Sequence, residues 1–201
     1  GINGFNELIC LSGYDPLSDD GVEFGLSIIK IANRLNNSLG RKYNVPVNIE
    51  QIPAENTSVK LADKDKVLAY NNGEYDFYSN QFIPLTVNAD ILDRMRLQGV
   101  YDEHFSGGSI FHANFENRIY DKERIKDMVK VCAKLGIVYF AFNYVLQRCE
   151  QDHMTVGRKD TCECGAEITD NFTRVVGFLT TTKTWHKVRR EQDFPNRQFY
   201  D

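Results

Sequence analysis

Residues 121–146 place an amphipathic helix directly before an unbroken apolar run, and this order strongly constrains the fold. Asp121 is a candidate N-cap, apolar residues then recur on one helical face, and Gly136 ends the pattern. The run that follows, IVYFAFNYVL, has no polar alternation, which is typical of a strand buried on both faces of a parallel sheet. A helix leading into such a strand predicts an α/β fold.

Earlier segments repeat this alternation. A long helix is predicted from the candidate caps Ser18 and Asp19 to about residue 39, and its wide apolar face should be covered on more than one side. VPVNIEQIPAEN indicates a short buried strand that ends at Pro53, with Glu55 in the loop beyond. The chain therefore carries strand and helix signals in turn.

The middle of the chain gives three further predictions. EYDFYSNQFIPL follows a turn signal and is expected to be extended. Residues 90–98 are expected to form a short helix closed by Gly99. SGGSIFHANF indicates a loop and then a strand, in which His112 would be half-buried. The SGGS segment could offer backbone N–H groups to phosphate, although a tight turn explains it equally simply.

Composition limits the classes of function. With 201 residues and 42% hydrophobic content the chain can bury the core of one ordinary domain. A net charge of −4 does not indicate a nucleic-acid binder. The longest apolar run is too short to cross a bilayer, and no signal-peptide pattern is present. We therefore expect a soluble, cytoplasmic protein without membrane or nucleic-acid partners.

From about Cys149 the chain turns polar and rich in cysteine. Cys149, His153, Cys162 and Cys164 offer four soft or borderline ligands within sixteen positions, a set that suits tetrahedral zinc. An odd total of five cysteines argues against a secreted disulfide framework. A segment this poor in apolar residues gains folding energy from a bound metal. The alternative is three reduced cysteines in a loop with an incidental histidine.

Gly177 lies among β-branched and aromatic residues in TDNFTRVVGFLTTTKTW. An isolated glycine in such a stretch usually marks a bulge or a close backbone approach. RVVGF, just after a cysteine-rich segment, nevertheless resembles the C-terminal signature of the glycyl radical enzymes. More narrowly, it is similar to the anaerobic (class III) ribonucleotide reductases, and most of all to phage-encoded members.

The resemblance covers most of the chain. GFNEL, NIEQIPAENTSVKLADKD, YSNQFIPL and SGGSIFH look like that family's catalytic-barrel segments, in the family's order, and PAENT and RVVGF are the most specific. It implies the C-terminal part of a ten-stranded β/α barrel (residues 1–145), a zinc-binding module (146–168), and a glycyl radical loop with the C-terminal tail (169–201). Two departures stand out. The family usually has two C-x-x-C pairs, and nothing here matches the setting of its substrate-activating cysteine.

The resemblance also implies a mechanism. A partner activating enzyme, which uses S-adenosylmethionine and an iron–sulfur cluster, would take a hydrogen atom from Gly177. The radical would then generate a cysteine thiyl radical in the N-terminal half of the reductase, which reduces ribonucleoside triphosphates to deoxyribonucleotides for DNA replication. Glycine suits this role because it has no side chain to clash with a planar radical centre. Glu55 would face the substrate ribose, unless it is only a solvated loop carboxylate.

Three readings remain open from the sequence. The first is the radical-bearing C-terminal part of the reductase, active with its N-terminal half as a homodimer or heteromer. The second is a stand-alone replacement module that docks onto a reductase with a damaged radical loop. The third is a non-enzymatic, zinc-binding interaction protein in which Gly177 is structural. The basic tail after residue 182 is a docking surface for the activating enzyme, a region that steers anions, or a solvated surface.

Overall fold

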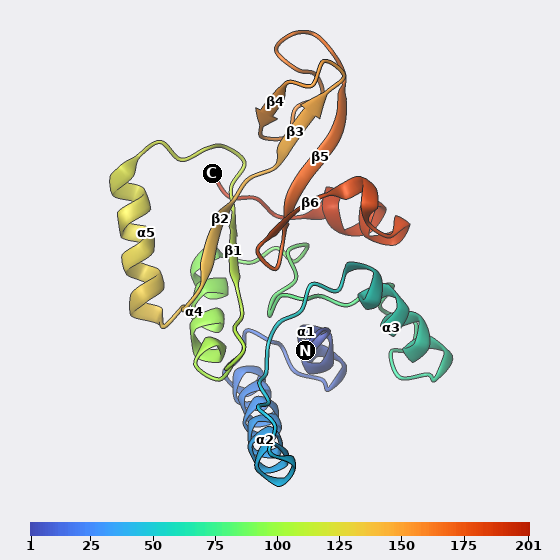
Figure 1. Cartoon of the computed structure of the whole chain (residues 1–201), viewed down its shortest axis with the longest axis vertical. Coiled ribbons are helices and arrows are strands. Elements are labelled where there is room, and N and C mark those ends of the chain that lie inside the picture. The colour runs from blue at the N-terminus through green and yellow to red at the C-terminus, as the bar shows by residue number, and fades with distance from the viewer.

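A pair of parallel strands lies at the centre of the chain, with helices beside it (Figure 1). The computed structural model describes residues 1–201, apart from the side chain of Glu55. Strand β1 (Phe111–Asn114) pairs in parallel with β2 (Phe140–Asn143), with Phe111 opposite Phe140. Helix α5 (Lys122–Leu135) connects them, so the expected helix-to-strand unit is confirmed.

The ends of α5 follow the predicted signals. The Asp121 side chain accepts hydrogen bonds from the backbone N–H groups of Glu123 and Arg124, and Gly136 ends the helix in the left-handed conformation at φ 81°. The apolar face of the helix packs onto the strand pair and α4 in a cluster whose buried members include Met95, Phe111, Phe115 and Cys132. Strand β2 is less buried than expected: its first three residues are half-buried, and Val138 and Tyr139, which precede it, are exposed.

Helix α4 (Ile91–Asp102) corrects one prediction. A short helix was expected over residues 90–98, but Asp90 is its N-cap and the helix continues through Gly99 for three more residues. A Cβ atom built on Gly99 would lie 1.8 Å from the carbonyl oxygen of Leu135, at the C-terminal end of α5. This glycine therefore permits a close approach between two helices and does not stop one.

The N-terminal region contains α1 (Phe5–Leu11), α2 (Asp19–Tyr43) and α3 (Glu55–Val67). Ser18 caps α2 by accepting a hydrogen bond from Gly21, and the helix is one turn longer than predicted. Its first half packs into an aromatic core cluster with buried members Phe5, Ile9, Ile29, Phe82, Tyr101 and Phe105. Its second half is not covered on more than one side, contrary to expectation.

The two expected strands between α2 and α4 are mostly irregular. Residues 49–51 make only isolated parallel bridges, between Ile2 and Gln51 and between Glu50 and Gly108. Pro46 and Pro53 bracket the segment and, lacking an N–H group, leave few residues free to pair. Residues 74–85 form turns and bends without a strand. Glu55 is not in a loop, because α3 begins with it.

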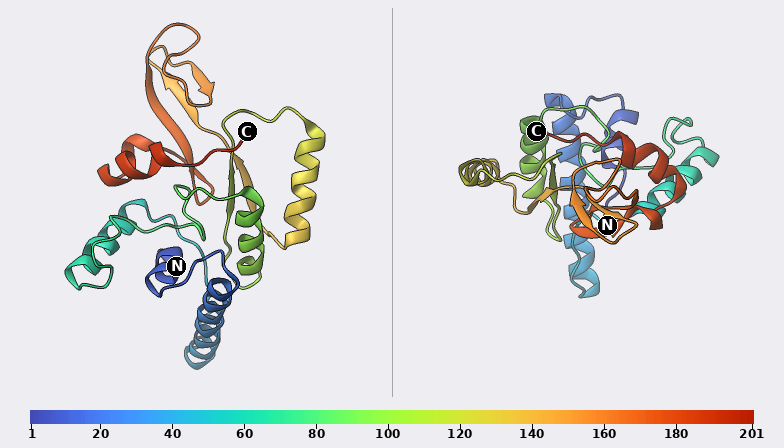
Figure 2. Two further views of the ribbon diagram at one scale, coloured as in Figure 1. Left: turned by 180° about the vertical axis from the view of Figure 1, so that it is seen from behind. Right: turned by 90° about the horizontal axis from the view of Figure 1, so that it is seen from above.

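A second, antiparallel sheet extends from the end of β2 (Figures 1 and 2). Its strand order is β4 (Met154–Val156), β3 (Leu146–Cys149), β5 (Ile168–Val175) and β6 (Phe178–Thr181). Only two residues separate β2 from β3, so the antiparallel sheet follows the parallel pair directly and extends away from it (Figure 1). The turn between β5 and β6 returns toward β1.

The C-terminal tail folds back onto the body of the chain. It forms the short helices η1 (Thr182–Thr184), η2 (Arg189–Asp193) and η3 (Phe194–Asn196), and then Tyr200 pairs in parallel with Phe115. Among the helices of the described chain, none combines the length and apolar character that a bilayer crossing requires.

Candidate functional site

Gly177 occupies the tight turn between β5 and β6, where Val175 pairs with Phe178. The two turn residues, Val176 and Gly177, have φ angles of 41° and 85°. Two-residue hairpin turns often require positive φ at both central positions, which glycine adopts at no steric cost. For the β-branched Val176 the same conformation is strained. The sequence predicted a bulge or a close backbone approach at Gly177, and the structure places this residue at the tip of a β-hairpin.

Both backbone polar groups of Gly177, its N–H and its carbonyl oxygen, form hydrogen bonds with side chains. Its N–H donates a hydrogen bond to Nε2 of His112 at 3.3 Å, and its carbonyl oxygen accepts one from Nη1 of Arg174 at 2.7 Å. A Cβ atom at this position would lie 3.3 Å from the hydroxyl oxygen of Tyr139 and 3.6 Å from Cδ1 of Ile110. The hairpin tip therefore packs against residues of, or next to, β1 and β2.

His112 is more deeply buried than expected, with 2% of its surface exposed. Burial, together with the positive charges of Arg197 and Arg174, lowers the pKa of its imidazole to about 3. The ring is therefore neutral near neutral pH. Because Nε2 accepts the Gly177 N–H, the proton lies on Nδ1, which is buried and has no hydrogen-bond partner among the described residues.

Buried asparagines join the hairpin to the parallel pair. The side-chain amide of Asn143 donates to Oδ1 of Asn114 at 2.7 Å and to Oγ1 of Thr173 at 3.1 Å, while its Oδ1 accepts the N–H of Arg174 at 3.3 Å. Asn114, Asn143 and Thr173 are almost completely buried. Buried polar groups that satisfy one another in this way specify a single arrangement. The position of Gly177 is therefore fixed from β1, β2 and β5 together.

The sequence indicated Gly177 but not its neighbours. The roles of His112, Tyr139 and the two asparagines were missed, and Arg174 was noted only as part of RVVGF. A usable signal was present, because Asn114 and Asn143 stand inside otherwise apolar strands, where a polar side chain needs a partner. The apolar residues beside Gly177 cover it only in part. Val175 is buried, but Phe178 and Leu179 are 65% and 51% exposed.

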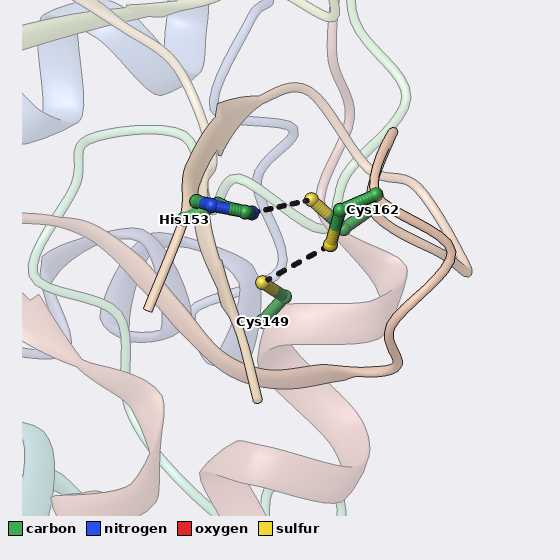
Figure 3. Close-up of side chains that lie close together, drawn as sticks. Cys149, His153 and Cys162 are labelled. Atoms are coloured by element: carbon green, nitrogen blue, oxygen red, sulfur yellow. Dashed lines mark hydrogen bonds between the residues drawn. The ribbon is translucent and has the colours of Figure 1, made fainter. Parts of the chain in front are cut away.

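The second candidate site brings together all four predicted metal ligands. The ligand atoms of Cys149, His153, Cys162 and Cys164 lie within 4.8 Å of one another. Sγ of Cys149 is 3.9 Å from Sγ of Cys164, and Sγ of Cys162 is 4.0 Å from Nδ1 of His153. Figure 3 shows Cys149, His153 and Cys162 turned toward a common centre. Zn–S bonds of about 2.3 Å in a tetrahedron separate two sulfurs by about 3.8 Å, so this donor set fits zinc.

Two tight turns create this geometry. Asp152, at φ 61°, lets the chain turn back so that the Cys149 N–H donates to the His153 carbonyl oxygen at 3.1 Å. Gly165, at φ 84°, closes the second turn, where the Cys162 N–H donates to the Ala166 carbonyl oxygen at 2.9 Å. The C-x-C pair therefore occupies one turn and the Cys–His pair the other, as in zinc sites built from two ligand-bearing turns.

The remaining predicted site residues have mixed outcomes. The side chain of Glu55 lies outside the described part of the structure. The backbone N–H groups of Gly107 and Gly108 donate to the carbonyl oxygens of Ile49 and Phe105, which favours the plain turn over a phosphate site. The basic tail is not simply a solvated surface, because two of its arginines are buried against Asp193.

Several solved structures match this architecture. The chain superposes over its whole length on 33% of a structure described as anaerobic ribonucleotide reductase, with 34% identity and a TM-score of 0.89. It also matches the Thermotoga maritima anaerobic ribonucleotide reductase in complex with dATP and CTP, with 33% identity and a TM-score of 0.81 over 95% of this chain and 32% of that one. A third match is the same enzyme with glycerol in the active site, with 32% identity and a TM-score of 0.83 over 97% of this chain and 33% of that one.

The fold is therefore that of an anaerobic ribonucleotide reductase, an oxidoreductase, and the chain spans about one third of the length of the structures it matches. A family model described as anaerobic ribonucleoside-triphosphate reductase matches residues 1–200. The chain belongs to this family. No curated protein sequence matches it.

Proposed function

We propose that this chain is the radical-bearing C-terminal part of an anaerobic ribonucleoside-triphosphate reductase, and that Gly177 carries the radical. The observation that supports this most is the setting of Gly177 in a chain of this family. A glycine stands at a hairpin tip, with hydrogen bonds to both its N–H and its carbonyl, against the parallel strand pair. A backbone radical needs a residue without a side chain, because the α-carbon must become planar.

The proposed chemistry proceeds by transfer of hydrogen atoms. An activating enzyme with S-adenosylmethionine and an iron–sulfur cluster removes one hydrogen atom from Cα of Gly177. The glycyl radical then takes a hydrogen atom from a cysteine thiol in the N-terminal half of the reductase and leaves a thiyl radical there. The thiyl radical removes the 3′-hydrogen of the substrate ribose, and the protonated 2′-hydroxyl leaves as water. A two-electron reductant, either formate or a thiol protein, then reduces the sugar, and the cysteine thiol returns the hydrogen atom to the 3′-carbon. Glu55 is proposed as an active-site carboxylate near this ribose.

The cysteine cluster is proposed as a structural zinc site. Four protein ligands complete a tetrahedron, which leaves no open position for catalysis. Zinc bound by Cys149, His153, Cys162 and Cys164 would hold together β3, β4 and the start of β5, the strand that ends at the hairpin tip. Its role would be to brace the hairpin and allow it to move as a unit during activation.

The partners follow from the share of the reductase that the chain represents. They are the N-terminal half, the activating enzyme and a ribonucleoside triphosphate, in a cytoplasmic homodimer or heteromer. A replacement module for a damaged radical loop needs only the hairpin and its support. The family match across residues 1–200 favours the larger role and opposes a purely zinc-binding interaction protein.

The test is anaerobic electron paramagnetic resonance. The chain is combined with its N-terminal half and activating enzyme, and we expect a doublet that collapses when Cα of Gly177 is deuterated. Exposure to air should then cut the backbone at residue 177. Gly177→Asn is a better control than alanine, because asparagine tolerates a φ of 85° and keeps the hairpin. A doublet that persists in Gly177→Asn, or no doublet in the unmodified complex, contradicts the proposal.

A further inference from the structure

The two hydrogen bonds at Gly177 polarise its flanking peptide groups in complementary directions. The N–H on one side of Cα donates a hydrogen bond to an imidazole nitrogen, and the carbonyl oxygen on the other side accepts a hydrogen bond from a charged guanidinium. We propose that His112 and Arg174 form a polarising clamp that stabilises an unpaired electron on Gly177. This inference rests on the proposed function, because the clamp matters only if the radical forms there.

The physical reason lies in how a glycyl radical delocalises. The amide nitrogen gives electron density to the α-carbon, and the carbonyl withdraws it. An acceptor on the N–H, as His112 provides, raises the electron density on nitrogen. A cationic donor on the carbonyl oxygen, as Arg174 provides, strengthens the withdrawal, and charge-assisted hydrogen bonds are the stronger kind. Both contacts therefore spread the spin away from Cα and weaken the Cα–H bond.

The clamp requires a neutral imidazole, and the surroundings provide one. His112 is 2% exposed and faces the positive charges of Arg174 and Arg197. A protonated ring would have a donor at Nε2 and would repel the Gly177 N–H. Burial holds the pKa at about 3, so Nε2 stays an acceptor across the physiological range.

The fold does not need these two bonds to shape the hairpin. The β5–β6 ladder, with four residue pairs, and the network centred on Asn143 already hold it in place. The bond from His112 crosses 65 residues of sequence to reach one particular amide. His112 and Arg174 are therefore assigned as positioning residues for the reacting glycine.

The test uses paired variants in the activated complex. His112→Leu removes the acceptor, whereas His112→Gln keeps an acceptor oxygen at similar reach. Arg174→Met removes the charged donor, whereas Arg174→Lys keeps one. The readouts are the α-proton splitting of the glycyl doublet and the amount of radical per chain at equilibrium. The splitting measures spin density on Cα, which a purely structural role would not change.

We expect a wider splitting in His112→Leu and Arg174→Met, and values near those of the unmodified complex in His112→Gln and Arg174→Lys. The radical content should fall about tenfold in Arg174→Met, which corresponds to about 1.4 kcal/mol. A doublet with the same splitting in all four variants overturns the clamp and leaves the radical assignment standing. No doublet in the unmodified complex overturns both.

Discussion

Glu7 shows how a single buried carboxyl group makes stability depend on pH. Its Oε1 accepts the N–H of Ser79 at 2.8 Å, whereas Oε2 is buried with no partner among the described residues. Burial raises the pKa of Glu7 to about 7, although the Ser79 N–H and the charge of Arg189 pull it down. In the unfolded chain this pKa is near 4.5, so the folded state holds a proton that the unfolded state releases first.

We expect Glu7 to favour the folded state fully below pH 4.5 and to lose that contribution as the pH rises through about 7. Glu7→Gln removes the titration and keeps an oxygen for Ser79. The variant should match the unmodified chain at pH 4 and be more stable at pH 8 by up to roughly 3 kcal/mol. Denaturant unfolding at the two pH values measures this. If the free energies of unfolding of Glu7→Gln and the unmodified chain differed equally at both pH values, the prediction would be wrong.

Among the elements, the contact between α4 and α5 depends on one missing side chain. Gly99 lies inside α4, where alanine would normally favour a helix by about 1 kcal/mol. The atom that a Cβ would meet is a backbone carbonyl oxygen at 1.8 Å, however, and backbone cannot rotate away as a flexible side chain can. The packing cost should therefore exceed the gain in helix propensity.

Gly99→Ala should destabilise the chain by about 1–3 kcal/mol, the usual cost of overpacking. Val100→Ala is a suitable control, because this neighbour in the same helix is 40% exposed and its truncation removes little buried surface. Thermal or denaturant unfolding compares the two variants. If Gly99→Ala were as stable as the control, the close approach of α4 and α5 would not hold in solution.

The elements that could be predicted from sequence are those whose signals are local. Asp121 and Gly136 mark the ends of α5 through caps that need only nearby residues. The role of Gly99 was predicted wrongly, because the group that requires a glycine there is the backbone carbonyl of Leu135, on another helix. The spacing of the four metal ligands was informative since two tight turns suffice to assemble them. The contact between His112 and Gly177 could not be predicted, because it depends on the fold of both sheets.

At the scale of the whole molecule, the antiparallel sheet links the two candidate sites. Strand β3 runs from the parallel pair to the cysteine cluster, and the antiparallel β5 returns from there and ends at the turn that contains Gly177 (Figure 1). Neither hydrophobic core cluster includes a residue between 146 and 168. A bound metal is therefore expected to order this end of the antiparallel sheet.

We expect about one zinc ion per chain, as four protein ligands imply. Chelation should increase amide exchange and proteolysis within residues 149–167, and His153→Ala should lower the metal content of the purified chain. Cys10→Ser is the matched control, since this cysteine lies outside the cluster. Metal analysis and hydrogen exchange report the two effects. Full zinc content in His153→Ala would remove it from the ligand set, and unchanged activation after zinc removal would count against the brace.

Helix α2 has a practical consequence for every one of these experiments. Ile31, Leu35 and Leu39 repeat at intervals of four, and each is about half exposed. A stripe of this kind on a long helix attracts a similar stripe from another molecule in water. The isolated chain should accordingly self-associate as its concentration rises. Light scattering across a dilution series ought therefore to precede any stability or exchange measurement, so that association is not mistaken for folding.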